Sequence, residues 1–445
     1  MRFRALAAAA LAVSATALAG CSGNAGADGD TIQWWTWDDK QAAAYQQCVP
    51  GFEAANPGLK VKISQYAVED YFTKITAGFV AGNAPDGFQN SVQFFQAYAA
   101  QHQLLPLDDL IKAGNFDLKK FSVGVDSWKF TDGKQYALPL DWAATGLYYN
   151  TDLLTKAGVD PKAVSDLDWN PDNGGSFERL VAKLSVDGKG VRGDQPGYDK
   201  NNVAVYGFGA LAAKDFIGQT TWSSFVSTLG WRQGDTQSWP STFNYTDPRF
   251  TKTMTWVRSL VDRGFAPKLG EFKSGTETDQ LASGKVAMST GGSWTAATFA
   301  KLPGIKVGLA PTVLGPDHKT RAVLSNSNGN VIWAGTKKAE ATWKWLSHMG
   351  SLECQTTAGA GGSFFPSIPA AMDATARTMA SQGVDLSVFT EAMKTGVLYP
   401  SVVYGNGAAI QSAVEPLFEA YFAGTRNEDV FAEMAQKSKD LLAKK

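Results

Sequence analysis

Histidine and cysteine are both scarce in this chain, whose 445 residues contain three of each. The histidines are His102, His318 and His348, and none of them stands at metal-site spacing from a cysteine or another histidine. The G-x-S-x-G, H-E-x-x-H and P-loop motifs are missing as well. The sequence therefore predicts no metal and no other cofactor, and it argues against the hydrolases and nucleotide-binding proteins that those motifs mark.

The chain also lacks an excess of charge of either sign. It has 41 Lys and Arg against 42 Asp and Glu, a formal net charge of −1 at pH 7. Proteins that hold a nucleic-acid backbone carry a basic surface, so nucleic acid is not an expected partner. Beyond the first 20 residues, no stretch has the length and apolarity of a membrane-spanning helix. We therefore expect the rest of the chain to fold outside the bilayer.

The one long apolar run is at the N-terminus. Arg2 and Arg4 precede an uncharged run, Leu6–Ala19, which is short for a bilayer span and typical of a signal peptide. The run ends in Leu18-Ala19-Gly20-Cys21, which resembles the lipobox of bacterial lipoproteins. That resemblance implies cleavage before Cys21 and acylation of its thiol. The alternative is an ordinary cleavage site with a chance cysteine.

This N-terminal pattern predicts the fate of the first 30 residues. Residues 1–20 are the expected signal peptide, and residues 21–30, which are small and polar, are an expected flexible tether. The mature protein would then be extracytoplasmic and attached to the cell membrane by lipid on Cys21.

Tryptophan, in contrast, is abundant, with 14 in the chain. Several tryptophans stand beside Asn, Asp, Ser or Gly in expected loops, where a ring can meet a polar ligand. Trp37 ends an expected strand over 32–37, and Trp294 follows an expected turn at Gly291-Gly292. A pyranose ring offers an apolar face to an aromatic ring and hydroxyls to polar groups. This combination favours a sugar ligand.

Strand and helix patterns alternate in the first hundred residues. Residues 32–37, 59–63 and 86–90 have strand patterns, and Phe72, Ile75 and Phe79 mark a helix between the last two. Such alternation predicts an α/β fold with a largely parallel sheet, which binds ligands beyond the carboxyl ends of its strands. The residues just after the strands are therefore candidates for ligand contact.

Five segments resemble, in the same order, the family 1 extracellular solute-binding proteins, the class that contains the maltodextrin-binding proteins. The segments are Ala81–Asp86, Gly133–Pro139, Gly146–Leu154, Gly284–Met288 with Gly292–Trp294, and Trp343–Leu346. The chain departs from the family pattern at residues 160–205, where the insert is long and the usual Trp-acid pair is replaced by Asp168-Trp169-Asn170. Ligand contacts from this insert are not assigned.

The resemblance implies two α/β lobes with a ligand cleft between them and about three hinge crossings, near residues 138–144, 324–332 and 364–371. Its lobes are then residues 31–139 with 330–366, and 140–329 with 367–445. It further implies a monomer that closes on its solute and delivers it to the permease subunits of an ABC importer. The first and late helices belong to one lobe in that layout, so Cys48 and Cys354 are expected to form a disulfide; two free thiols are the alternative.

The candidate ligand contacts combine strand ends, the expected hinge and the late loops. Trp294 is the expected stacking residue, Asp39 and Asn90 are expected partners of sugar hydroxyls, and Asp141 is an expected bidentate acceptor. The full set is Trp37, Asp38, Asp39, Asn90, Gln93, Asp141, Trp142, Gly292, Trp294, Asn328, Tyr404 and Asn406.

Three classes of function fit these features to different degrees. A sugar-binding protein without enzyme activity fits the acids, amides and aromatic rings at these positions. An extracellular carbohydrate-active enzyme would need a catalytic carboxylate pair, for which Asp39 and Asp141 are the candidates. A binder of a charged solute such as a phosphate ester would need Arg or Lys at the strand ends, which carry acids and amides instead.

Overall fold

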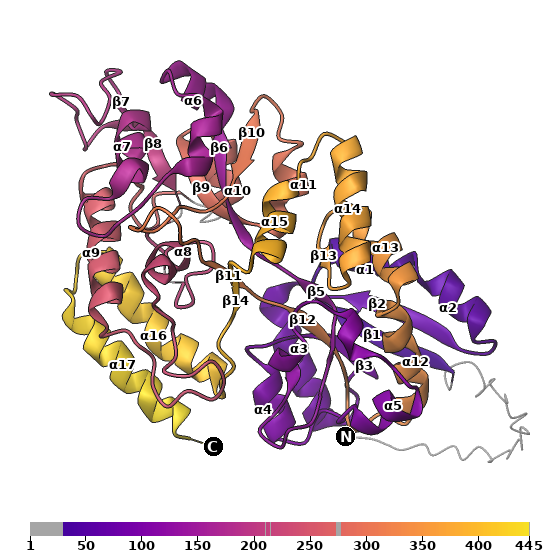
Figure 1. The fold of residues 1–445 in the computed structure, drawn as a ribbon. Coiled ribbons are helices and arrows are strands. Elements are labelled where there is room, and N and C mark those ends of the chain that lie inside the picture. The colour runs from indigo at the N-terminus through magenta and orange to yellow at the C-terminus, as the bar shows by residue number, and fades with distance from the viewer. Residues whose placement is uncertain (1–29, 210, 214, 273–276, 445) are drawn as a thin grey trace, which may run out of the picture.

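The computed structural model describes residues 30–444 except 210, 214 and 273–276. The expected signal peptide, Cys21 and all but the last residue of the expected tether lie outside the described residues. Figure 1 shows two lobes side by side, each built around its own five-stranded sheet.

The first sheet has the strand order β2-β1-β3-β12-β4. In β1, Ile32, Trp34 and Thr36 point inward while their neighbours are half-buried, the alternation that a strand with one covered face requires. The strands are β1 (Thr31–Thr36), β2 (Lys60–Gln65), β3 (Gly87–Ser91), β4 (Leu138–Pro139) and β12 (Asn328–Ile332).

Among the described residues, seven α-helices belong to the first lobe. Pro50 lies in the first turn of α2, where its missing N–H is tolerated, and Gly82 ends α3 in the left-handed conformation with φ of 70°. The helices are α1 (Asp39–Gln46), α2 (Val49–Ala55), α3 (Val68–Ala81), α4 (Phe95–Ala100), α5 (Asp108–Ala113), α12 (Ala339–Met349) and α13 (Leu352–Gly359).

The second sheet has the strand order β10-β6-β9-β8-β7. Its strands are β6 (Thr145–Asn150), β7 (Val186–Asp187), β8 (Val203–Gly209), β9 (Val286–Gly292) and β10 (Val307–Ala310). Its helices are α6 (Thr151–Lys156), α7 (Gly175–Leu184), α8 (Ser223–Val226), α9 (Pro248–Asp262), α10 (Glu277–Ala282), α11 (Ala296–Phe299), α14 (Pro369–Ser381), α15 (Ser387–Thr395), α16 (Gly407–Phe422) and α17 (Asp429–Leu442).

The core of the second lobe is rich in aromatic rings. Trp169 is fully buried there and packs edge-on against Phe225 and Trp256. Trp222, also fully buried, stacks on Phe418 of α16. The insert at residues 160–205 therefore contributes its tryptophan to the core, so the altered Asp168-Trp169-Asn170 segment supports packing.

The expectation of a largely parallel sheet holds for only part of the molecule. β1 is parallel to β2 and β3, but β12 is antiparallel to β3 and β4. In the second sheet only β8 and β9 are parallel. The prediction was wrong there because the alternation of buried residues marks a strand without marking its direction, which depends on the segments that connect it.

Three connecting segments lie side by side between the sheets (Figure 1). The chain leaves the first sheet at β4 and reaches β6 through β5 (Asp141–Trp142). It returns from β11 (Val323–Ser325) to β12, and it passes from α13 to α14 through β13 (Phe365–Pro366), which pairs with β5. β14 (Leu398–Pro400) pairs with β11.

A disulfide between Cys48 and Cys354 joins the start of α2 to α13 within the first lobe. The two Cα atoms are 5.5 Å apart although 306 positions separate the residues in sequence. Of the helices that the structure describes, none has both the length and the apolar character needed to cross a membrane.

Candidate functional site

A cavity of about 540 Å³ lies between the two lobes. The first lobe, the second lobe and the connecting segments all contribute to its wall. Its lining residues are Trp37, Asp38, Gln41, Val68, Phe72, Ser91, Gln93, Phe94, Asp141, Trp142, Ala143, Gln219, Ser293, Trp294, Asn326, Asn328, Ser363, Phe364 and Gln411. Seven of the predicted contacts are among them, namely Trp37, Asp38, Gln93, Asp141, Trp142, Trp294 and Asn328.

The carboxyl end of β1 places an aromatic ring and a carboxylate on the cavity wall. Trp37 packs edge-on against Tyr71 at 5.2 Å and tilted against Phe72 at 5.4 Å between ring centroids. Asp38 caps α1, because its Oδ1 accepts the Gln41 N–H at 2.8 Å. Burial raises the pKa of the Asp38 carboxyl, and the neighbouring Asp39 raises it further.

Asp141 stands where the lobes connect and is only 3% exposed. Its Oδ2 accepts from Gln41 Nε2 at 2.7 Å and from Asn328 Nδ2 at 3.0 Å, while its Oδ1 accepts the Asn328 N–H at 2.9 Å. Burial raises the pKa of this carboxyl although these hydrogen bonds oppose the rise, and the charge of Asp38 adds to it. Asp141 thereby ties α1 and β12 to the connecting strand β5.

Trp294 lies in a short 3-10 turn, Ser293–Thr295, directly after β9. Its indole covers the backbone of Gly292, where an added Cβ would lie 2.3 Å from ring atoms. The predicted turn at Gly291-Gly292 was wrong, since both glycines belong to β9 and pair with Gly146 and Thr145. The reason for a glycine at position 292 is therefore the close approach of the indole, and Gly292 itself does not line the cavity.

Four other predicted contacts also lie outside the cavity wall. Asp39 is exposed, and its Oδ1 accepts the Lys40 N–H at the start of α1, so Asp38 takes the place expected of Asp39. Asn90 is fully buried within β3, where its Oδ1 accepts the Ser91 N–H. The strand runs one residue further than its pattern predicted, which keeps the Asn90 side chain inside the lobe.

The remaining two, Tyr404 and Asn406, belong to the packing before α16. Tyr404 is 3% exposed and packs edge-on against Phe243. Asn406 donates its amide to the backbone oxygens of Leu441 and Lys444, at 2.9 and 2.6 Å. Asn406 thereby holds the end of α17, and Tyr404 packs in the core of the second lobe. Sequence reasoning could not foresee these contacts, because the segments meet only in the folded protein.

Sequence reasoning also missed several lining residues. Gln41 carried a local signal, since it is three residues after the cap Asp38 and so lies on the same end of α1. Gln219 Oε1 accepts from Asn326 Nδ2 at 3.0 Å and thereby joins the region after β8 to a connecting segment. Gln219 had no signal in the sequence, because its position depends on how the region after β8 folds.

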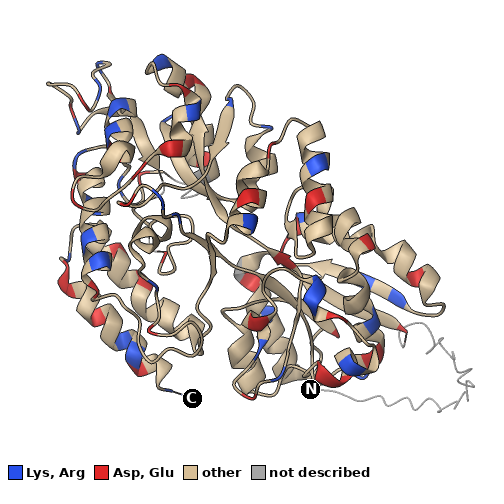
Figure 2. Ribbon diagram, viewed as in Figure 1, with Lys and Arg blue, Asp and Glu red and all other residues tan. Residues whose placement is uncertain are grey.

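The charge of the cavity wall is acidic. Asp38 and Asp141 are its two charged side chains, and the lining residues include neither Lys nor Arg. Figure 2 shows that elsewhere residues of both signs are interspersed over the helices of both lobes. Outside the lining residues, Lys40 Nζ donates to Thr298 Oγ1 across the lobes at 3.3 Å. Among the described residues, no group of three or more His, Cys, Asp or Glu side chains could hold a metal ion.

Known proteins resemble this chain in sequence and in fold. It is 28% identical over 172 residues to a lactose-binding protein of Rhizobium radiobacter, a match that spans 37% of each chain. It is 24% identical over 347 residues to a maltodextrin-binding protein of Bacillus subtilis, covering 78% of this chain and 75% of that one. An ABC substrate-binding protein of Listeria monocytogenes, solved with cycloalternan, has the same fold, with a TM-score of 0.74, 22% identity, and coverage of 93% of this chain and 98% of that one.

The family model for bacterial extracellular solute-binding proteins matches residues 47–382. That range includes α2 to α14 of the first and second lobes, the connecting segments and most of the cavity wall. The two lobes, the cavity between them and this match lead to one conclusion: the chain belongs to the bacterial extracellular solute-binding protein family.

Proposed function

We propose that this protein binds a neutral mono- or oligosaccharide between its lobes and delivers it to the permease subunits of an ABC importer. The observation that carries the proposal is the presence, in one cavity, of half-buried aromatic rings together with acids and amides. Trp37 and Trp294 offer rings from opposite lobes, and Asp38 brings a carboxylate, which can accept sugar hydroxyls, to the same cavity. Relatives and structural neighbours described as binding lactose, maltodextrin and cycloalternan support a sugar.

The alternatives fit the cavity less well. A phosphate ester would meet two carboxylates and no Lys or Arg side chain from the described lining residues. A glycosidase would need a carboxylate pair, but Asp39 is not on the wall, and both oxygens of Asp141 already accept protein donors. We therefore propose a binding protein that is not an enzyme and that works as a monomer.

The proposed motion is a hinge between the lobes. We propose lobes of residues 31–139 with 330–366 and of 140–329 with 367–445, although β12 already joins the first sheet at Asn328. A ligand that contacts both Trp37 and Trp294 would stabilise the closed arrangement, since it gains contacts there that the open form lacks. The permease would then recognise the closed form.

The experiment is a thermal-shift screen of the mature protein against neutral sugars, acidic sugars and sugar phosphates. A ligand that binds only the folded state raises the melting temperature. We expect neutral sugars to raise it and sugar phosphates to leave it unchanged. Stabilisation by sugar phosphates alone, or turnover of the stabilising sugar in a product assay, would contradict the proposal.

We further propose that lipid on Cys21 holds the protein at the outer side of the cell membrane, with residues 1–20 removed as a signal peptide. The apolar run before Leu18-Ala19-Gly20-Cys21 supports this anchor. Metabolic labelling with a fatty-acid probe should mark the wild type and leave the Cys21→Ser variant unlabelled. Equal labelling of the two would rule the anchor out.

A further inference from the structure

The two lobes touch directly along one edge of the cavity between them. A Cβ added to Gly407, the first residue of α16, would lie 2.6 Å from the carbonyl oxygen of Gln93 in the first lobe. Gln93 lines the cavity, and so does Gln411, one turn further along α16. Because this contact borders the cavity, the lobes cannot separate at this edge without breaking it.

A second contact between the lobes lies outside the cavity and is aromatic. Trp239 of the second lobe packs edge-on against Phe130 of the first, with 5.3 Å between ring centroids. Trp239 also packs on the hydrophobic cluster that contains Val403 of the second lobe and Phe95 of the first. Apolar side chains of both lobes therefore exclude water together here, which stabilises the contact.

Open space lies on both sides of these contacts. A second cavity, of about 460 Å³, is lined by α4 of the first lobe and, in the second, by the segments around Trp239 and just before α16. It shares no lining residue with the first cavity. Since the contacts run between two hollow regions, few atoms join the lobes at this edge. The loss of one ring therefore removes a large part of the contact.

The backbone of Trp239 is held in an unfavourable conformation. Its φ of 56° lies in the left-handed region, which bulky residues rarely adopt. Its N–H donates to the Val403 oxygen at 2.7 Å, and the Val403 N–H donates to the Gln237 oxygen at 3.0 Å. Such a conformation persists only where the surrounding structure determines it. The segment after β14 therefore fixes the indole against the first lobe.

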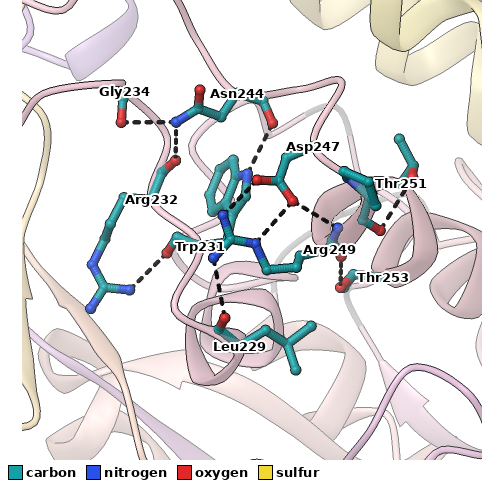
Figure 3. Close-up of polar contacts among 10 residues, drawn as sticks. Leu229, Trp231, Arg232, Gly234, Asn244, Asp247, Arg249, Thr251 and Thr253 are labelled. Carbon is teal, nitrogen blue, oxygen red and sulfur yellow. Dashed lines mark hydrogen bonds and ion pairs between the residues drawn. The ribbon is translucent and has the colours of Figure 1, made fainter.

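The loop that carries Trp239 is closed at its base, as Figure 3 shows. Asn244 donates its amide to the backbone oxygens of Arg232 and Gly234, at 3.0 and 2.9 Å. The Trp231 indole N–H donates in turn to the Asn244 oxygen at 2.9 Å. These bonds tie the two ends of the loop together, so the loop keeps its place on the second lobe.

Phe130 is supported in a similar way within the first lobe. Its N–H donates to the Lys134 oxygen at 3.1 Å, and its oxygen accepts the Gly133 N–H at 2.9 Å. Its ring also packs edge-on against Tyr136, with 6.0 Å between centroids. Because each ring is fixed to its own lobe, their contact acts on the position of the lobes.

We propose that the ring pair of Trp239 and Phe130, together with the contact at Gly407, is a latch that holds the lobes together before any ligand binds. The affinity that a protein shows for a ligand is reduced by the fraction of molecules outside the binding-competent arrangement. A latch that raises the competent fraction therefore strengthens the binding of every ligand by the same factor. The latch sets the overall affinity, whereas the cavity residues set the choice of ligand. This inference goes beyond the proposed function, because it concerns the protein without its ligand.

Small-angle X-ray scattering of the ligand-free protein tests the latch without any sugar. Trp239→Ala and Phe130→Ala should each raise the radius of gyration, because the lobes then separate more often. Gly407→Ala should do the same for a different reason, since its added Cβ meets a backbone oxygen of the other lobe. Trp239→Asn replaces Trp239→Ala if that variant does not fold, because Asn tolerates a left-handed backbone.

Calorimetric titration with the neutral sugars that stabilise the wild type measures the effect on binding. The interaction of one aromatic pair corresponds to about a fivefold change in an equilibrium constant. Trp239→Ala and Phe130→Ala should therefore each bind every such sugar about fivefold more weakly. The double variant should lose no more affinity than either single variant, because the two rings share one contact.

Two control variants separate the latch from general effects of substitution. Trp35→Ala removes a half-buried ring whose aromatic partner, Tyr66, belongs to the same lobe. Gly405→Ala adds a Cβ two residues before Gly407, and this Cβ would lie 3.8 Å from Trp239, an ordinary contact distance. Both variants should keep the radius of gyration and the affinities of the wild type.

Each result decides the matter. Folded Trp239→Ala and Phe130→Ala variants with the wild-type radius of gyration would overturn the latch, as would losses of affinity that add up in the double variant. Losses that differ from one sugar to another would assign the rings to ligand contact and would also overturn it. If the wild type binds no sugar at all, the proposed function fails, and the scattering experiment alone then decides on the latch.

Discussion

The two sides of the first cavity are built on different principles. On one side Asp38, Gln41, Asp141 and Asn328 form a polar wall in which the side chains hold one another through hydrogen bonds. On the other side the Trp294 indole packs on the backbone of Gly292, which has no side chain. This packing positions the indole without the need for a hydrogen bond from its N–H. The polar wall is thus part of the framework that joins the lobes, whereas Trp294 lies just beyond the carboxyl end of β9, the central strand of the second sheet.

This difference separates stability from binding. Removing a member of the polar wall leaves buried donors unpaired, which costs folding free energy as well as ligand contacts. Removing Trp294 opens space at a half-buried surface and should affect the ligand alone. The lobes differ in a similar way, since the disulfide between Cys48 and Cys354 lies in the first lobe, while the second depends on its aromatic core.

The largest expected effect is loss of the disulfide. In the Cys48→Ser/Cys354→Ser variant the unfolded chain regains the freedom that a loop closure of this length removes, worth on the order of 5 kcal/mol in the chain-entropy model. We expect the first lobe to melt first in calorimetry, giving two transitions, with the second lobe little changed. A single transition at the wild-type temperature would contradict this contrast between the lobes.

Asp141→Ala is expected to destabilise the folded protein by about 3 kcal/mol, because it leaves Gln41 Nε2 and two donors of Asn328 without their acceptor. Chemical denaturation measures the loss. Because Asp141 is only 3% exposed, its removal is expected to affect folding as well as ligand contacts. Asp39→Ala is the matched control and should leave both stability and affinity close to wild type, since Asp39 is exposed.

Trp294→Ala is expected to weaken binding of the cognate sugar by about 2 kcal/mol, roughly thirtyfold, while the melting temperature of the ligand-free protein changes little. Calorimetric titration gives the affinity, and a thermal melt without sugar gives the control. A variant that is folded and binds sugar like the wild type would remove Trp294 from the site. If Trp294→Ala destabilised the folded protein as much as Asp141→Ala does, the proposed difference between the two sides of the cavity would be wrong.

The smallest expected effect concerns pH. Burial holds the pKa of Asp141 above its ordinary value in the folded protein, so the folded state binds the proton more tightly than the unfolded state. The contribution of the Asp141 carboxyl to the free energy of unfolding is therefore fully present at a pH below its pKa in the unfolded chain, near 3.9. This contribution is lost as the pH rises through the higher pKa of the carboxyl in the folded protein. The stability of the wild type relative to Asp141→Asn should fall over that interval and then level off. A difference that grows with pH would reverse the sign of the shift.

Prediction from sequence was most successful where the signal is local. Trp37 and Asp38 follow a strand whose alternation is plain, and Trp294 follows the end of another, so their place at strand ends could be foreseen. The predicted positions of Asn90 and Tyr404 on the wall of the first cavity were wrong, because the features that bury these side chains are not local. One more residue of strand buries the Asn90 side chain, and Phe243, from a distant segment, covers Tyr404. Neither event leaves a mark within a few residues of the position concerned.

The sequence by itself determined the alternation of strands and helices, the family resemblance, and the acids and aromatic rings at the ends of strands, because each depends on neighbours within a turn or a strand. Only the tertiary structure decided which of those side chains share a cavity. It also decided the direction of the strands in the second sheet, the role of Asp141 as a link between lobes, and the contact of Trp239 with Phe130 across the lobes. All of these depend on contacts between segments far apart in the chain, whose meeting is set by packing of the two lobes against each other.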